Sequence, residues 1–157
     1  MKKLIIPYLL VMTVITIVIG LLTFYKKIDF NEPMLEIAVY CFLFGVFGGT
    51  LHCMRGYYLH TALLKNWDND WNVWYYVRPI VGGMLGLISL VFIKAGLLVF
   101  ATESKILIEG SNIMAYFAVA FIAGYNVQNF LVKLEEIFEA TLGIKKTLSS
   151  KPEKKEG

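Results

Sequence analysis

The side chains best suited to acid–base or nucleophilic chemistry in this sequence are two histidines, His52 and His60, and two cysteines, Cys41 and Cys53. A hydrolase or transferase needs a base, a nucleophile and an oxyanion donor that converge on one site. Neither histidine has an acidic residue at helical spacing, and no serine lies in a G-x-S-x-G sequence. The cysteines fall within one apolar stretch, which favours buried free thiols over a disulfide. We therefore expect no catalytic residues and no enzymatic activity.

Metal and cofactor sites are not indicated either. His52, Cys53 and His60 are too few for a zinc site and contain no closely spaced ligand pair of the usual kind. The glycine-rich residues 82–86 are not a phosphate-binding loop, because no strand precedes them and no Lys-Ser/Thr pair follows. We expect neither a metal ion nor a cofactor.

The composition excludes a soluble globular domain. Of the 157 residues, 57% are apolar and only 17% are charged, and the mean hydropathy is +0.62. A soluble domain is roughly 45–50% apolar and about 25% charged. A chain of this length buries only about 70% of its surface, so a water-soluble core cannot cover the excess of apolar residues. The composition indicates a small integral membrane protein of one domain.

Four apolar segments have the length of membrane-spanning helices. Pro33 and Pro79 suit the beginnings of the second and third helices. After the fourth segment, apolar residues keep helical spacing among charged ones, which predicts an amphipathic extension that ends near Gly143. The expected spans cover residues 4–25, 34–54, 79–100 and 112–132.

We therefore expect an all-α integral membrane protein: a four-transmembrane-helix bundle with an interfacial helix between spans two and three and a short cytoplasmic amphipathic helix. Residues 1–144 form the membrane domain, and residues 145–157 form a basic, disordered tail. Most basic residues lie on the side of the termini, which the positive-inside rule places in the cytoplasm. The basic residues on the side of the termini are Lys2, Lys3, Arg55, Lys65, Arg78, Lys133 and the tail lysines. Those on the other side are Lys26, Lys27, Lys94 and Lys105.

All three tryptophans, Trp67, Trp71 and Trp74, fall between spans two and three. Their spacings of four and three residues place them on one face of a helix. Tryptophans at the membrane–water interface fix the depth of a helix, so we interpret them as interface anchors. A docking surface for a partner or ligand is the alternative.

Two G-x-x-x-G pairs, Gly45/Gly49 and Gly82/Gly86, lie in spans two and three. Such pairs let helix backbones approach closely in a membrane. The sequence leaves open whether these grooves pack helices within one chain or between copies.

Polar residues within apolar spans are costly unless they face protein or water. Lys94 lies about two turns before the expected end of span three, where it either reaches outward, pairs with Glu36 or lines a path. The alternatives for the whole set are hydrogen bonds and ion pairs within the bundle, or a water-filled path or ligand pocket. The set comprises Glu36 and Lys94 on the outer side and His52, Arg78, Asn126 and Asn129 on the cytoplasmic side.

Three segments in the C-terminal half carry a resemblance: Arg78-Pro79-Ile80-Val81-Gly82-Gly83-Met84-Leu85-Gly86, residues 94–98 and residues 121–125. They resemble small uncharacterised bacterial multi-pass membrane proteins that share an R-P-x-x-G-x-x-x-G span. The resemblance implies a protein of the bacterial inner membrane. It brings no known activity and no functional residues.

The expected function is that of a self-associating membrane protein, namely a channel or pore-forming effector. A non-conducting membrane anchor or regulatory subunit that docks a cytoplasmic protein is one alternative, and a phage-type lysis pore is another. The expected partners are the lipid bilayer, further copies of the chain and a cytoplasmic protein. Nucleic acid is not expected, because there is no folded basic module to position it.

Overall fold

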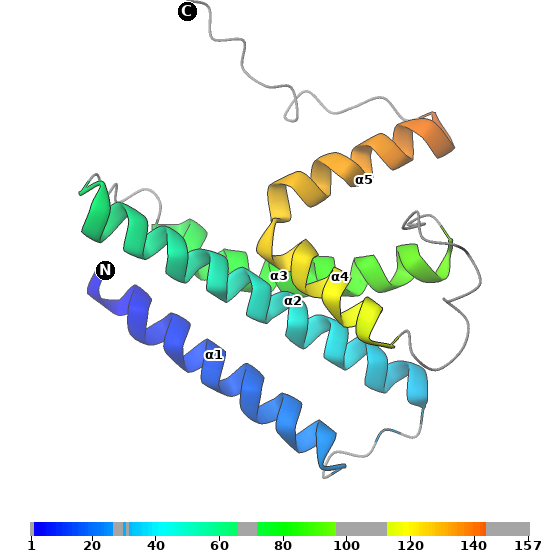
Figure 1. Ribbon diagram of the computed structural model, residues 1–157, viewed down its shortest axis with the longest axis horizontal. Coiled ribbons are helices and arrows are strands. Elements are labelled where there is room, and N and C mark those ends of the chain that lie inside the picture. Colours follow the sequence, from blue (N-terminus) through cyan, green and yellow to red (C-terminus); the bar gives the residue numbers. More distant parts are fainter. Residues whose placement is uncertain (1, 27–29, 31, 66–71, 97–112, 144–157) are drawn as a thin grey trace, which may run out of the picture. The chain divides into compact units, whose positions relative to one another are not determined.

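Helices make up the regular structure throughout the part of the chain that the structure describes (Figure 1). Three of them are long and apolar enough to cross a membrane, and the number rises to four when Ile113–Tyr125 and Val127–Thr141 count as one broken span. The all-helical prediction is therefore confirmed. The computed structural model describes residues 2–26, 30, 32–65, 72–96 and 113–143.

The first two helices follow the sequence-based expectation at their beginnings. Helix α1 covers Lys2–Phe24, and α2 covers Pro33–Tyr58 with its proline in the first turn. A π-helical turn, η1 (Leu59–Leu63), continues α2 well beyond the expected end at residue 54. The joined 31-residue segment rises about 46 Å. Its length exceeds the roughly 30 Å of a hydrocarbon layer, so one end reaches beyond such a layer.

The third helix begins before Pro79, where the sequence predicts the third span to start. Helix α3 covers Asn72–Lys94, so seven residues precede the proline. Proline inside a helix leaves one carbonyl without its usual partner. Membrane-spanning helices tolerate this loss because neighbouring helices and local backbone adjustments satisfy the freed groups, and Pro79 is fully buried. The helix ends at Lys94 and is followed by Gly96 with φ of +72°, a backbone angle that favours glycine after a helix.

The expected continuous fourth span is broken at Asn126. Helix α4 covers Ile113–Tyr125 and α5 covers Val127–Leu142. Asparagine side chains compete with the helical backbone for hydrogen bonds, which accounts for a break at this residue. Helix α5 ends one residue before Gly143, whose φ is +68°, so the expected end of the amphipathic extension is confirmed.

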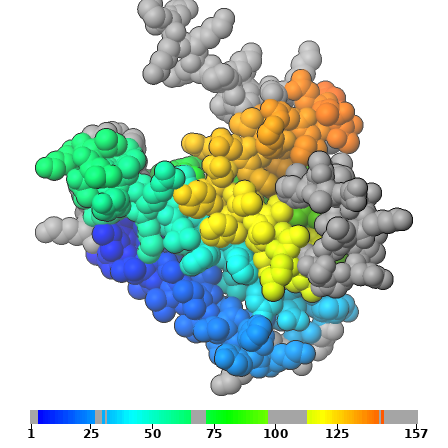
Figure 2. Space-filling view, in the orientation of Figure 1, coloured from blue at the N-terminus to red at the C-terminus, as the bar shows by residue number. Residues whose placement is uncertain are grey.

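The chain divides into two compact units, Met1–Val127 and Gln128–Gly157. In the first unit, α2 lies at the centre and packs against α1, α3 and α4, and α3 also packs against α4. Figure 1 shows α1 running alongside α2, and Figure 2 shows α4 (yellow) directly against α2 (cyan). The second unit contains α5 from Gln128 onward, and on it Lys133 and Glu136 form an exposed ion pair at 2.8 Å.

Candidate functional site

Three glycines from three helices form the centre of the first unit: Gly45 of α2, Gly82 of α3 and Gly124 of α4. A Cβ atom placed on Gly82 would lie 2.7 Å from the carbonyl oxygen of Gly45. A Cβ atom on Gly124 would lie 2.8 Å from the Cα atom of Gly45. Because these neighbours are backbone atoms, a larger residue would force the helices apart. The three backbones are in direct contact.

The remaining expected packing glycines lie on the same α2–α3 contact. A Cβ atom on Gly49 would lie 3.1 Å from the Arg78 carbonyl oxygen, and one on Gly86 would lie 3.2 Å from the Cα atom of Gly45. The two G-x-x-x-G pairs therefore pack helices within one chain. The contact with α4 was missed by sequence reasoning, although Gly124 lies in residues 121–125, one of the three segments that carry the resemblance.

Arg78 is the charged residue that this packing encloses. It is only 5% exposed, and it lies six residues after the start of α3 at Asn72, about 9 Å along the helix axis. Its guanidinium carbon lies 5.2 Å from the centre of the Trp74 ring, in a cation–π arrangement. Cys53 and Tyr75 lie within electrostatic range of the guanidinium group. Its Nε atom is buried without a hydrogen-bond partner.

Two further basic residues, His52 and Arg55, lie on α2, and His52 lies between the two arginines in the chain of interactions. His52 is close enough to interact electrostatically with Arg78 and with Arg55. Arg55 donates a hydrogen bond of 3.1 Å to the hydroxyl of Tyr125, whose ring lies 5.3 Å from that of His52. The Nδ1 atom of His52 is buried without a hydrogen-bond partner. We call His52, Arg55 and Arg78 the basic cluster.

The carboxylates that the structure describes in the first unit lie far from the basic cluster. Glu32 precedes α2 and Glu36 lies in its first turn. Sixteen residues of continuous helix separate Glu36 from His52, a distance of about 24 Å along the axis. Among the described residues of this unit, no carboxylate neutralises Arg78.

Lys94 lies at the end of a helix, whereas the sequence predicts a position about two turns before the end of the third span. It is the last residue of α3 and is exposed. The 23 residues of α3 rise about 34 Å, enough to cross the roughly 30 Å of a hydrocarbon layer. Among the described residues, no ion pair joins Lys94 to Glu36. The earlier beginning of α3 thus moves Lys94 to the helix end and moves Arg78 inward.

The other expected site residues are dispersed. Asn126 lies in the break between α4 and α5, and Asn129 lies in α5. Trp74 lies in the first turn of α3 and is 41% exposed. Trp67 and Trp71, and with them the expected interfacial helix, lie outside the described residues.

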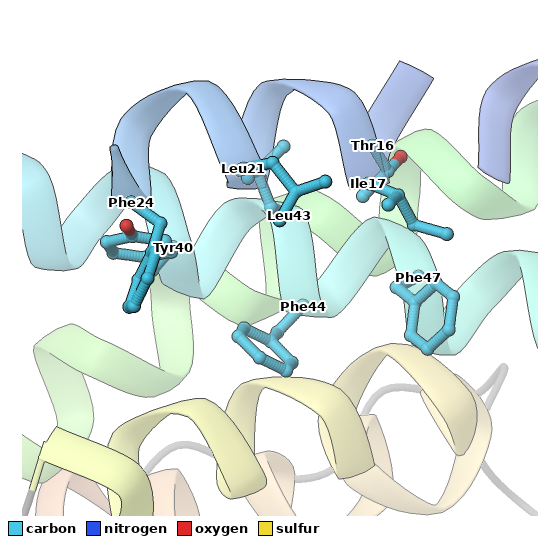
Figure 3. Close-up of a pocket in the computed structure, with 9 residues that line it drawn as sticks. Thr16, Ile17, Leu21, Phe24, Tyr40, Leu43, Phe44 and Phe47 are labelled. Atoms are coloured by element: carbon cyan, nitrogen blue, oxygen red, sulfur yellow. The ribbon is translucent and has the colours of Figure 1, made fainter. Parts of the chain in front are cut away.

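Grooves flank the contact between α1 and α2. The larger groove, of about 310 Å³, has almost entirely apolar walls (Figure 3). A second groove of about 300 Å³ follows the same two helices and includes Met54, Tyr57 and Thr61. Among the described residues that line them, neither groove contains a histidine, a cysteine, a lysine or a carboxylate. The larger one is lined by Thr16, Ile17, Gly20, Leu21, Phe24, Tyr40, Leu43, Phe44 and Phe47.

The remaining reactive groups are the cysteines and the possible metal ligands. Cys41 and Cys53 are buried free thiols, as the sequence predicts. Within the described ranges, no three His, Cys, Asp or Glu side chains gather in a group that could hold a metal ion. No family model, curated protein or solved structure matches the chain.

Proposed function

We propose that the chain is a small, non-enzymatic integral membrane protein of the bacterial inner membrane, with four spans and both termini in the cytoplasm. Helix α1, the joined α2–η1 segment and α3 have the length and apolarity of spans. Helix α4 has 13 residues and rises only about 20 Å, so the fourth span needs the first turns of α5 as well. Basic residues are concentrated on the side of the termini, which supports this orientation.

We propose further that copies of the chain associate into a channel or pore-forming effector whose path lies between copies. The contact of Gly45, Gly82 and Gly124 carries this proposal. It leaves no room for a path between α2, α3 and α4 within one chain, so the proposed path lies between copies. The G-x-x-x-G pairs are occupied inside the chain and do not serve association. The grooves beside α1 remain for it, since helices associate in membranes through van der Waals packing.

A non-conducting anchor or regulatory subunit is the second candidate. Helix α5 supports it, because apolar residues at helical spacing alternate there with charged ones such as the Lys133–Glu136 pair. An amphipathic helix of this kind can dock a cytoplasmic protein. This function requires no conduction.

Mass and ion flux, measured on one nanodisc and liposome preparation, test the proposal. We expect a mass of several copies of the 17.8 kDa chain and ion flux that depends on the protein. Gly20→Phe fills the larger groove, and its added Cβ atom meets nothing nearer than Leu43 Cδ1 at 4.0 Å, so it should lower mass and flux together.

Val14→Phe is the matched control, because Val14 is exposed on α1 and does not line that groove. It should leave mass and flux unchanged. A monomeric wild-type chain without flux would overturn the channel and leave the anchor, and a stable oligomer without flux would refute conduction alone.

A further inference from the structure

Arg78 is a buried positive charge, and among the described residues of its unit no carboxylate lies close enough to neutralise it. A guanidinium group keeps its charge, and burying it without an anionic partner is expensive. Arg78 is 5% exposed, its Nε atom has no hydrogen-bond partner, and the described carboxylates of its unit lie at the far end of α2. An ionisable residue at such a depth in a span marks a functional site by default.

The surroundings of Arg78 fit an anion better than they fit a cation or a neutral ligand. Arg55 adds a second guanidinium group, His52 adds an imidazole, and Tyr125 and Tyr75 add hydroxyls from α4 and α3. Arg55 is exposed and His52 is half-buried, so the basic cluster extends from the surface of the unit to the enclosed Arg78. An anion can therefore reach the cluster from the Arg55 side.

We propose that the basic cluster binds a phosphate group, with Arg78 as its principal ligand. The planar fork of guanidinium donors matches phosphate oxygens in a bidentate manner. The Trp74 ring lies over one face of that fork, 5.2 Å from the guanidinium carbon, and the Nε donor on the edge of the fork has no hydrogen-bond partner.

The depth of the cluster indicates where such a phosphate comes from. Arg78 lies about 9 Å from the start of α3, next to a tryptophan of the kind that marks the headgroup level. The phosphate of an anionic phospholipid is available at this level, and so is that of a soluble phosphate compound in the adjoining water. Both sources present the same group to the arginine.

Lipid competition measured by native mass spectrometry tests the site on the full-length protein. With equal amounts of phosphatidylglycerol and phosphatidylcholine, we expect wild-type protein to retain phosphatidylglycerol preferentially. Arg78→Gln should weaken that retention about tenfold or more, as loss of a charge-assisted hydrogen-bonded contact implies. Lys94→Gln is the matched control, because it removes a charge from the other end of the same helix, and it should retain the lipid like wild type.

Two further variants keep the test valid if Arg78→Gln fails to fold. Arg55→Gln removes an exposed member of the cluster and should weaken retention by a smaller factor. Arg78→Lys keeps the charge but not the planar fork, and should retain lipid at a level between wild type and Arg78→Gln. Helix content from circular dichroism establishes that each variant is folded.

Inorganic phosphate separates the two sources. Wild-type protein in neutral detergent is melted with sodium phosphate or with sodium chloride at equal ionic strength. Stabilisation by phosphate without lipid preference assigns the site to a soluble phosphate compound, and lipid preference assigns it to the headgroup. Equal retention of both lipids together with no stabilisation by phosphate would overturn the site. None of these measurements depends on oligomer mass or ion flux. The phosphate site can therefore be refuted without refuting the proposed channel, and the channel without refuting the site.

Discussion

At the scale of single residues, the glycines determine how closely the helices approach. Gly45, Gly82 and Gly124 put three backbones in contact, whereas Gly20 on α1 has open space at the corresponding position. In an isolated helix, glycine is less favourable than alanine by about 0.8–1.0 kcal/mol. The same substitution therefore has opposite expected effects at Gly124 and at Gly20.

Gly124→Ala should destabilise the protein by roughly 2–3 kcal/mol, because the added methyl group would overpack against the backbone of Gly45. Gly20→Ala should be neutral or stabilising by up to about 1 kcal/mol. Titration with a denaturing detergent, followed by circular dichroism, gives the free energy of unfolding of both variants. Equal stability of the two variants would show that α2 and α4 do not meet at Gly124.

The sequence anticipated the glycines of α2 and α3 but not their partner in α4. A G-x-x-x-G pair is visible in one helix, whereas Gly124 is a single small residue whose role depends on the rotation of α4. The basic cluster could be predicted only in part, for the same reason. His52 and Arg78 were recognised as costly residues, but Arg55 and Tyr125 join them only through the packing of separate helices.

At the scale of elements, the apolar segments predict the helices, but Pro79 leads to a predicted start of α3 that is too late. Pro79 was expected to begin a span because proline suits a first turn, yet α3 begins at Asn72. The proline is tolerated inside α3, where it is fully buried and where Gly49 of α2 allows close approach to its backbone. The break at Asn126 was missed because the apolar pattern continues through it.

The end of α3 gives a prediction about backbone conformation. Gly96 has φ of +72° and no atom near a built Cβ, so substitution there causes backbone strain without a clash. Gly96→Ala should lower the free energy of unfolding by about 1–2 kcal/mol, the cost of a left-handed conformation for a residue with a Cβ. Asparagine adopts this conformation more readily.

The asparagine variant supplies the control for this prediction. Gly96→Asn should lose less stability than Gly96→Ala in the same detergent titration. If both substitutions are neutral, α3 does not end at Lys94, and the inward position of Arg78 relative to the helix ends has to be revised.

At the scale of the whole molecule, the contact of Gly45, Gly82 and Gly124 holds α2, α3 and α4 together within one chain. The intrachain glycine contacts assign the G-x-x-x-G pairs to folding, and they leave the surfaces beside α1 for association. The basic cluster lies in the half of α2 and α3 that the proposed topology places toward the cytoplasm. The proposed phosphate site and the proposed association surface therefore lie on different residues of the bundle.

The number of spans decides this topology, and it depends on whether α4 and the first turns of α5 together cross the bilayer. Three spans would place the two termini on opposite sides of the membrane, and four would place them on the same side. A dual reporter of alkaline phosphatase and green fluorescent protein fused after Gly157 distinguishes these arrangements, because the phosphatase is active outside and the fluorophore forms inside. With four spans, we expect fluorescence without phosphatase activity. Phosphatase activity without fluorescence would place the C-terminus outside and rule out the four-span topology.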